Sequence, residues 1–210
     1  MKNPRTGLCR VSRGQALIEL ALFFPLLMFM VIGATDIAGL LDDHLSIVYA
    51  ARTGARVGSV MGDNQYADCA VIGAVRAALA NNPNITLNQI TIYDAQPDGI
   101  DPVYYNGNLN APLEDVYPGS ASCISSSPNS GTISVAPTTY NWPPNGGGSL
   151  NTPPRDVTPF TESSIGVKLD YTYTFSFTPF GGGSFVSSDY VVMPLEVIII
   201  DNATPTPTPQ

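Results

Sequence analysis

The apolar residues near the N-terminus form one nearly continuous run. It extends from Ala16 to Leu41, and as a helix it would be about 39 Å long, enough to cross a bilayer core of about 30 Å. Beyond Leu41, apolar and small residues recur close to the helical period as far as Ala55. The pattern therefore predicts one helix that crosses a membrane and continues outside it.

Shorter patterns downstream predict a second helix and a small antiparallel sheet. Residues 65–80 are rich in Ala and are followed by Asn-Asn-Pro, which predicts a helix that ends there. Residues 165–178 alternate between apolar and polar, as in a strand with one buried face. Residues 88–95 and 189–200 are predicted as further strands, and Pro194 places the last one at a sheet edge or a bulge. The predicted fold class is α+β.

The middle of the chain has a different composition. About half of residues 96–160 are Gly, Pro, Ser or Asn, which favours long loops over packed elements. We expect six parts: a basic cytoplasmic leader (1–14), a transmembrane helix (15–41), exterior helices with a first strand (42–95), a loop-rich insertion (96–160), C-terminal antiparallel strands (161–202) and a Pro/Thr-rich tail (203–210).

The charges are distributed unevenly and predict an orientation. Lys2, Arg5, Arg10 and Arg13 precede the apolar run, whereas all 17 acidic residues follow these four. The positive-inside bias then places the N-terminus in the cytoplasm and the C-terminal domain outside it, in a single-pass membrane protein. The acidic excess argues against nucleic-acid binding. No good cleavage site of a secretory signal follows the run, which favours a retained anchor.

Three cysteines fall on the two sides of the predicted membrane. Cys9 lies in the basic leader, while Cys69 and Cys123 lie in the exterior part. A Cys69–Cys123 disulfide is the natural pairing in an oxidising compartment, and two unpaired buried thiols are the alternative. The sequence leaves both possibilities open.

No motif in the chain predicts an enzyme, a cofactor or a metal site. The motifs of hydrolases, nucleotide-binding loops and zinc proteases are absent from the sequence. His44 is the only histidine, and we expect it to be structural. The acidic residues near 94–101 and 114–115 could offer oxygen ligands to Ca²⁺, but their spacing matches no EF-hand, and solvated loops are the plainer interpretation.

Glu19 lies at the start of the apolar run, where a charge is costly. An ionised group deep in a bilayer costs about 2.5–3.5 kcal/mol, and such groups usually have a partner. Position alone leaves two alternatives: an interfacial carboxylate in contact with water, or a functional group.

The stretch "RGQALIELALFFPLL", which contains Gly14, Glu19 and Pro25, resembles the N-terminus of TadE-like proteins, minor pseudopilins of Tad (tight adherence) type IV pilus systems. The later block "VYAARTGARVGSV" resembles the next part of the family pattern, and "IGVKLDYTYTFSFTPFGG" with "VVMPLEV" resembles its closing strands more loosely. The resemblance implies that a prepilin peptidase cuts between Gly14 and Gln15. Glu19 would then be fifth in the mature chain and could pair with the N-terminal amine of a neighbouring subunit, a docking role in which a buried ion pair sets the register.

By this resemblance, the chain is a structural subunit of the cell envelope. It would pack against other pilin or pseudopilin subunits in the membrane and support adherence. The alternative is a single-pass, membrane-tethered binding module, an adhesin or sensor ectodomain, whose interaction surface lies in residues 96–160.

Overall fold

A computed structural model describes residues 13–96, 99–108, 111–127, 130–157, 163–175 and 183–195. The predicted leader up to residue 12, including Cys9, the end of the last predicted strand and the C-terminal tail lie outside these residues.

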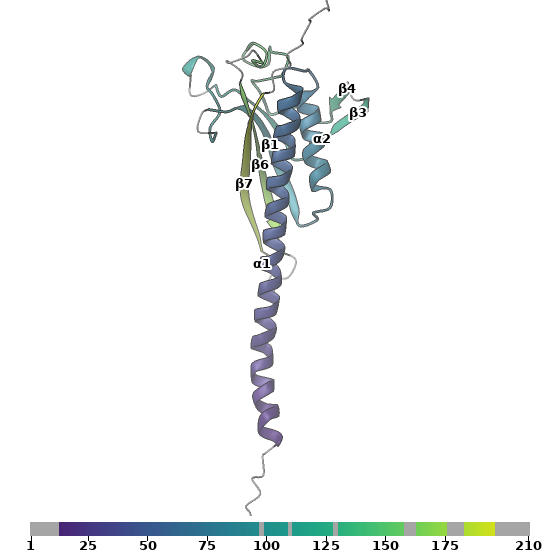
Figure 1. Ribbon diagram of the computed structural model, residues 1–210, viewed down its shortest axis with the longest axis vertical. Helices are drawn as coiled ribbons and strands as arrows, with labels where there is room; N and C mark the ends of the chain where they lie inside the picture. Colours follow the sequence, from purple (N-terminus) through teal and green to yellow (C-terminus); the bar gives the residue numbers. More distant parts are fainter. Residues whose placement is uncertain are drawn as a thin grey trace, which may run out of the picture.

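One long helix, α1 (Arg13–Met61), dominates the molecule. Its first half projects away from the rest of the chain, and its second half packs against a domain (Figure 1). It continues through Pro25 and Gly54 and ends at Met61. Gly62 follows with a φ of +57°, and its N–H donates to the Gly58 carbonyl at 3.0 Å. This left-handed glycine is a common helix end. The predicted extension of the helix beyond the apolar run is thus confirmed.

The domain is a five-stranded antiparallel sheet covered on one face by two helices (Figure 1). The second helix, α2 (Ala67–Leu79), lies beside α1, and a short hairpin packs near it. The α+β prediction is confirmed. In chain order the strands are β1 (Ile85–Asp94), β2 (Glu114–Pro118), β3 (Cys123–Ser127), β4 (Ser130–Ile133), β5 (Thr139–Tyr140), β6 (Ser164–Thr174) and β7 (Ser184–Pro194), with a 3-10 turn η1 (Tyr105–Gly107). The main sheet has the order β5-β2-β1-β6-β7, and β3 pairs with β4.

The alternation predicted for β6 is seen in its burial. Its odd-numbered residues from Ile165 to Tyr173 are all buried. Gly166 is also buried because the Tyr93 ring of β1 lies across it, and a Cβ there would collide with that ring. Pro194 is the last residue of β7, an edge strand, where its missing N–H costs no ladder bond.

The core lies between the sheet and the two helices. Close approach is possible because α1 presents small residues there, and a Cβ added at Gly54 would come within 2.8 Å of Val75 in α2. The largest fully buried apolar side chains of this core are Ile47, Ile72, Ile90, Ile92, Ile165, Leu169, Val71, Val75 and Val167.

The segment 96–160 contains more regular structure than its composition predicts. It supplies β2 and β5 to the main sheet as well as the β3–β4 hairpin. In β2 the short run Glu-Asp-Val-Tyr-Pro pairs with β1, with Ile90 opposite Tyr117 and Thr91 opposite Val116. Averaging over a long window hides such a five-residue strand among loop residues.

Candidate functional site

The lower half of α1 is an exposed apolar rod. Leu17, Ile18, Leu22 and Met30 are each more than two-thirds exposed, and the domain covers none of the most apolar stretch. Within the described residues, this is the one helix long and apolar enough to cross a membrane, and it fits a single-pass anchor. Exposed apolar surface on this scale is rare in a soluble monomer and is typical of surface that lipid or other subunits cover.

The predicted processing and docking residues lie at the N-terminal end of this rod. Gly14 is the second residue of α1 and is exposed, and a Cβ added there would meet none of the described residues outside its own stretch of helix. Gln15 follows it in the helix, and Glu19 lies one turn further on, also exposed. Glu19 forms no hydrogen bond or ion pair with any described residue, so a partner for its carboxylate must come from outside these parts of the chain.

The outer face of α1 continues above the predicted membrane span as a ridge. Leu41, Leu45 and Tyr49 are 58%, 65% and 63% exposed, and their four-residue spacing places them on one face. Arg52 and Arg56 extend the same face and are exposed, without an ion pair to any described residue. We refer to these five residues as the outer ridge. It faces away from the core and offers both apolar contact and positive charge to a partner.

The upper half of the domain is held by a buried ion cluster. Arg155 donates from Nη2 to Asp68 of α2 at 2.5 Å, and the same nitrogen lies 3.4 Å from Asp115 of β2. The Arg155 side chain is fully buried, and its guanidinium stacks over Trp142 at 4.4 Å from the ring centroid. Tyr117 donates its hydroxyl to Asp68 at 2.8 Å. The cluster thus joins α2, the sheet and the loop that carries Arg155.

The pKa values in this cluster are shifted because the groups are buried. Burial, and then the neighbouring Asp68 carboxylate, raises the pKa of Asp115 to about 8, against the opposing effect of Arg155. The same two causes raise the pKa of Tyr117 above its usual range. Arg155 Nη1 is buried without a hydrogen-bond partner among the described residues, but Nε and Nη2 and both carboxylates are bonded to other protein groups, which indicates a structural role.

Sequence analysis did not single out Arg155. The available signal was that Arg155 is the only basic residue between Arg76 and Lys168. A lone cation in a stretch with several carboxylates is a candidate for pairing, but its partners are up to 87 residues away in the sequence.

A disulfide between Cys69 and Cys123 links α2 to the β3–β4 hairpin. The Cα atoms are 4.9 Å apart, and the two residues are 54 positions apart in the sequence. Of the two states that the sequence leaves open, the structure has the bonded one. The bond holds an otherwise small two-stranded element against the domain.

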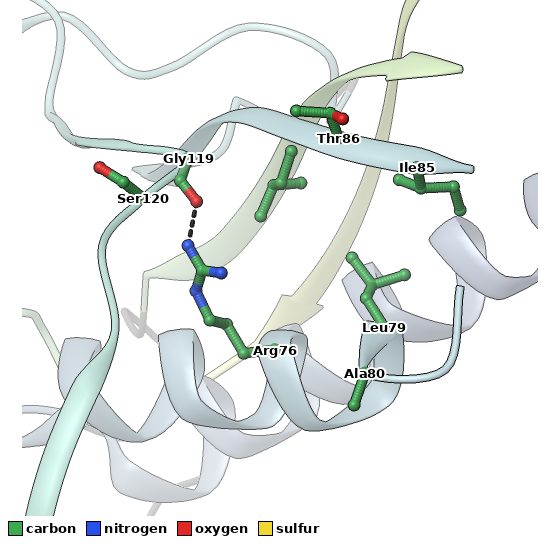
Figure 2. Close-up of a pocket in the computed structure, with 8 residues that line it drawn as sticks. Arg76, Leu79, Ala80, Ile85, Thr86, Gly119 and Ser120 are labelled. Carbon is green, nitrogen blue, oxygen red and sulfur yellow. Dashed lines mark hydrogen bonds between the residues drawn. The ribbon is translucent and has the colours of Figure 1, made fainter. Parts of the chain in front are cut away.

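A groove of about 410 Å³ lies between the end of α2 and strand β1 (Figure 2). Arg76 points across it toward Gly119, donating to the Gly119 carbonyl and, through Nε, to the Ala121 carbonyl at 2.5 Å. Leu79 and Ile85 form its apolar side. Arg76 uses two of its donors to bind the segment after β2, so these donors are not available to a ligand in the groove.

His44 takes part in a contact between α1 and the edge of the sheet. Its Nδ1 lies 3.3 Å from Oδ2 of Asp189 in β7, and Tyr171 of β6 donates to the same oxygen at 3.0 Å. Below this contact a mostly apolar cavity of about 220 Å³ is lined by residues that include Leu40, Tyr173 and Phe185. The arrangement fastens the helix to β6 and β7.

The acidic residues considered for Ca²⁺ are dispersed. Asp115 lies in the buried cluster, whereas Asp94 accepts a hydrogen bond from Ser163 at 3.3 Å, and Asp98 lies outside the described residues. Burial raises the pKa of Asp94 to about 6, against two hydrogen bonds that lower it. Within the parts of the chain that the structure describes, no three His, Cys, Asp or Glu residues gather as metal ligands would.

Comparison with protein-family models finds a match to the N-terminal part of the chain. Residues 14–56 match the family described as TadE-like protein. The match begins at the glycine of the predicted processing site, includes Glu19 and ends at Arg56 of the outer ridge. It confirms the resemblance seen in the N-terminal sequence. No curated protein and no solved structure matches the chain.

Proposed function

We propose that this protein is a minor pseudopilin of a Tad-type pilus, a membrane-anchored assembly subunit that supports adherence. The observation that carries the proposal is the coincidence of two features. The residues that match the TadE-like family are those of α1, and its lower half is exposed apolar surface that a lone domain would not keep in water. The role is structural, and no chemical step is assigned to the chain.

In this proposal, a prepilin peptidase removes the leader between Gly14 and Gln15. The new amine on Gln15 and the carboxylate of Glu19 are then two opposite charges at the edge of the membrane. Each costs free energy to bring into the bilayer alone, and each is neutralised when it meets the other group on a neighbouring subunit. The exposed, unpaired state of Glu19 toward the described residues supports this role.

The outer ridge is the proposed continuation of the same contact outside the membrane. Leu45 and Tyr49 are exposed on the helix face opposite the core, directly above the apolar rod. A neighbouring pilin-like helix that packs along the rod would meet this ridge next. Arg52 and Arg56 would then select a partner with acidic groups at the same height.

The test is pilus assembly with Glu19→Ala in cells that lack the native copy. We expect the protein to reach the membrane but pili to be lost or strongly reduced, because docking lacks its charge pair. Asp42→Ala is the matched control, since Asp42 is also an exposed helix carboxylate but lies above the apolar run. If Glu19→Ala assembles normally, the docking role is wrong.

N-terminal sequencing of the protein from membranes tests the processing step separately. A chain that begins at Gln15 supports pseudopilin maturation. A chain that retains Met1 contradicts it and favours the membrane-tethered adhesin or sensor.

A further inference from the structure

The membrane-facing end of the sheet carries a cluster of three aromatic rings. Tyr173 lies near the end of β6, Phe175 directly follows that strand, and Phe185 lies at the start of β7. Their ring centroids are 5.2, 5.6 and 6.1 Å apart, so each ring touches the other two. We call these three residues the aromatic end. In Figure 1, β6 and β7 run alongside α1, and this end of both strands lies where the helix leaves the domain.

The height of the aromatic end can be worked out along α1. A Cβ added at Gly39 would lie 3.7 Å from the Tyr173 hydroxyl, so Tyr173 is level with Gly39. Gly39 is 20 residues beyond Glu19, which is about 30 Å along a helix and equals the thickness of a bilayer core. If Glu19 lies at one edge of the hydrocarbon, Tyr173 lies at the other.

The surface around the aromatic end is apolar. Leu40 and Leu41 of α1 line the cavity beside Tyr173 and Phe185, and Leu41 is 58% exposed. Val186, next to Phe185 on β7, is 72% exposed. This apolar surface is continuous with the exposed rod of α1 below it.

Of the two α1 carboxylates on the sheet side nearby, Asp43 lies higher than Gly39, and Asp36 lies lower but faces the sheet. Asp43 is buried and accepts hydrogen bonds from Asn82 and Asn84, about one helical turn above Gly39. Asp36 is seven residues before Asp43 and therefore on the same helix face, toward the sheet, where it is half-buried. Among the residues that the structure describes, the exposed side chains at this end of β6 and β7 thus carry no charge.

We propose that the surface at the aromatic end, formed by Phe175, Phe185, Leu41 and Val186 around the buried Tyr173, rests in the interfacial layer of the outer leaflet. Tyr173 is itself buried, so the lipid would be met by the half-buried Phe175 and Phe185 rings and by the exposed Leu41 and Val186 beside them. Phe and Leu side chains insert at the boundary between headgroups and acyl chains. The domain would then touch the bilayer at a second point besides the helix, which fixes its height and its rotation about α1. The inference requires that α1 spans the membrane, but it is independent of pilus assembly.

The experiment uses three single substitutions on one face of β7 as a depth ruler: Val186→Trp, Ser188→Trp and Tyr190→Trp. All three positions are exposed, so tryptophan fits without entering the core. Steps of two residues separate them by about 6.6 Å each. The full chain is reconstituted in phosphatidylcholine vesicles with brominated acyl chains, which quench tryptophan fluorescence on contact. The buried native Trp142 supplies a constant background.

We expect bromine to quench Val186→Trp strongly and Ser188→Trp less, with Tyr190→Trp no more quenched than the unsubstituted protein. Equal quenching at Val186 and Tyr190, or none at either, would overturn the proposal. A blue-shifted emission for Val186→Trp without bromine quenching would also overturn it, since it would indicate contact with another protein chain. Cells with normal pili and no quenching would separate this failure from a failure of the proposed function.

Discussion

Gly54 is the residue whose replacement tests how the two helices of the domain pack. In Gly54→Ala, the new Cβ would lie 2.8 Å from Val75 Cγ2 and 3.4 Å from Val71 Cγ1, both in α2. The first distance is well below a normal carbon contact of about 3.5–4.0 Å. Val75 is fully buried in a helix, where valine has one strongly preferred rotamer, so its methyl group cannot turn away cheaply. The helices must move apart instead.

Two opposing effects set the magnitude. Overpacking by one methyl group costs about 1–3 kcal/mol, whereas replacing glycine by alanine within a helix gains about 1 kcal/mol. We therefore expect Gly54→Ala to lower the free energy of unfolding by about 1 kcal/mol, and by about 2 kcal/mol at most. Gly73→Ala in α2 is the matched control. Its Cβ would meet only Cys123 Cβ, at an ordinary 3.6 Å, so this variant should gain up to about 1 kcal/mol.

The assay is urea unfolding of the full chain in a mild detergent, followed through the fluorescence of Trp142. This residue is buried in the domain and is the only tryptophan, so the signal reports the domain rather than the membrane helix. We expect Gly54→Ala to lower the free energy of unfolding and Gly73→Ala to raise it. A Gly54→Ala protein that is stabilised as much as Gly73→Ala would refute the argument that close helix approach requires Gly54.

Two further predictions concern buried charges. Arg155→Met should destabilise the domain by about 3–5 kcal/mol in the same urea assay, because Asp68 and Asp115 lose their cation. Arg76→Met should cost less, because it removes the donor from two uncharged carbonyl groups rather than from two carboxylates. A pKa of Asp94 raised from 3.8 to about 6 means that the folded state binds its proton more tightly than the unfolded state. The free energy of unfolding should therefore fall as the pH rises from about 4 to about 6, by at most about 3 kcal/mol. Asp94→Asn should remove this part of the pH dependence. An unchanged pH slope in that variant would contradict the assignment.

The sequence predicts those elements whose pattern is long and local. The helix α1 and the strand β6 have many consecutive residues that obey one period, so both are found close to their true places. Gly62 ends α1 by its backbone conformation, which hydrophobic periodicity does not report. The strands β2 and β5 are short, and the residues that pair with them are distant, so loop composition hides them.

The candidate site divides in the same way. Gly14, Gln15 and Glu19 are accessible to sequence reasoning because their arrangement lies within six residues. The outer ridge could not be predicted from the sequence, because only the packing of the opposite helix face shows that Leu45 and Tyr49 remain exposed. The aromatic end could not be predicted from the sequence either, because Gly39 and Tyr173 come together only when the sheet folds back along the helix.

Because α1 is one continuous helix, it also has a mechanical consequence. Its 49 residues form a rod about 74 Å long, clamped by the sheet at one end and free at the other. A pull or twist on the domain is therefore transmitted to the anchor directly, with no linker to absorb it. Pro25 removes one backbone hydrogen bond in the free part, so this is the position where the rod bends under load.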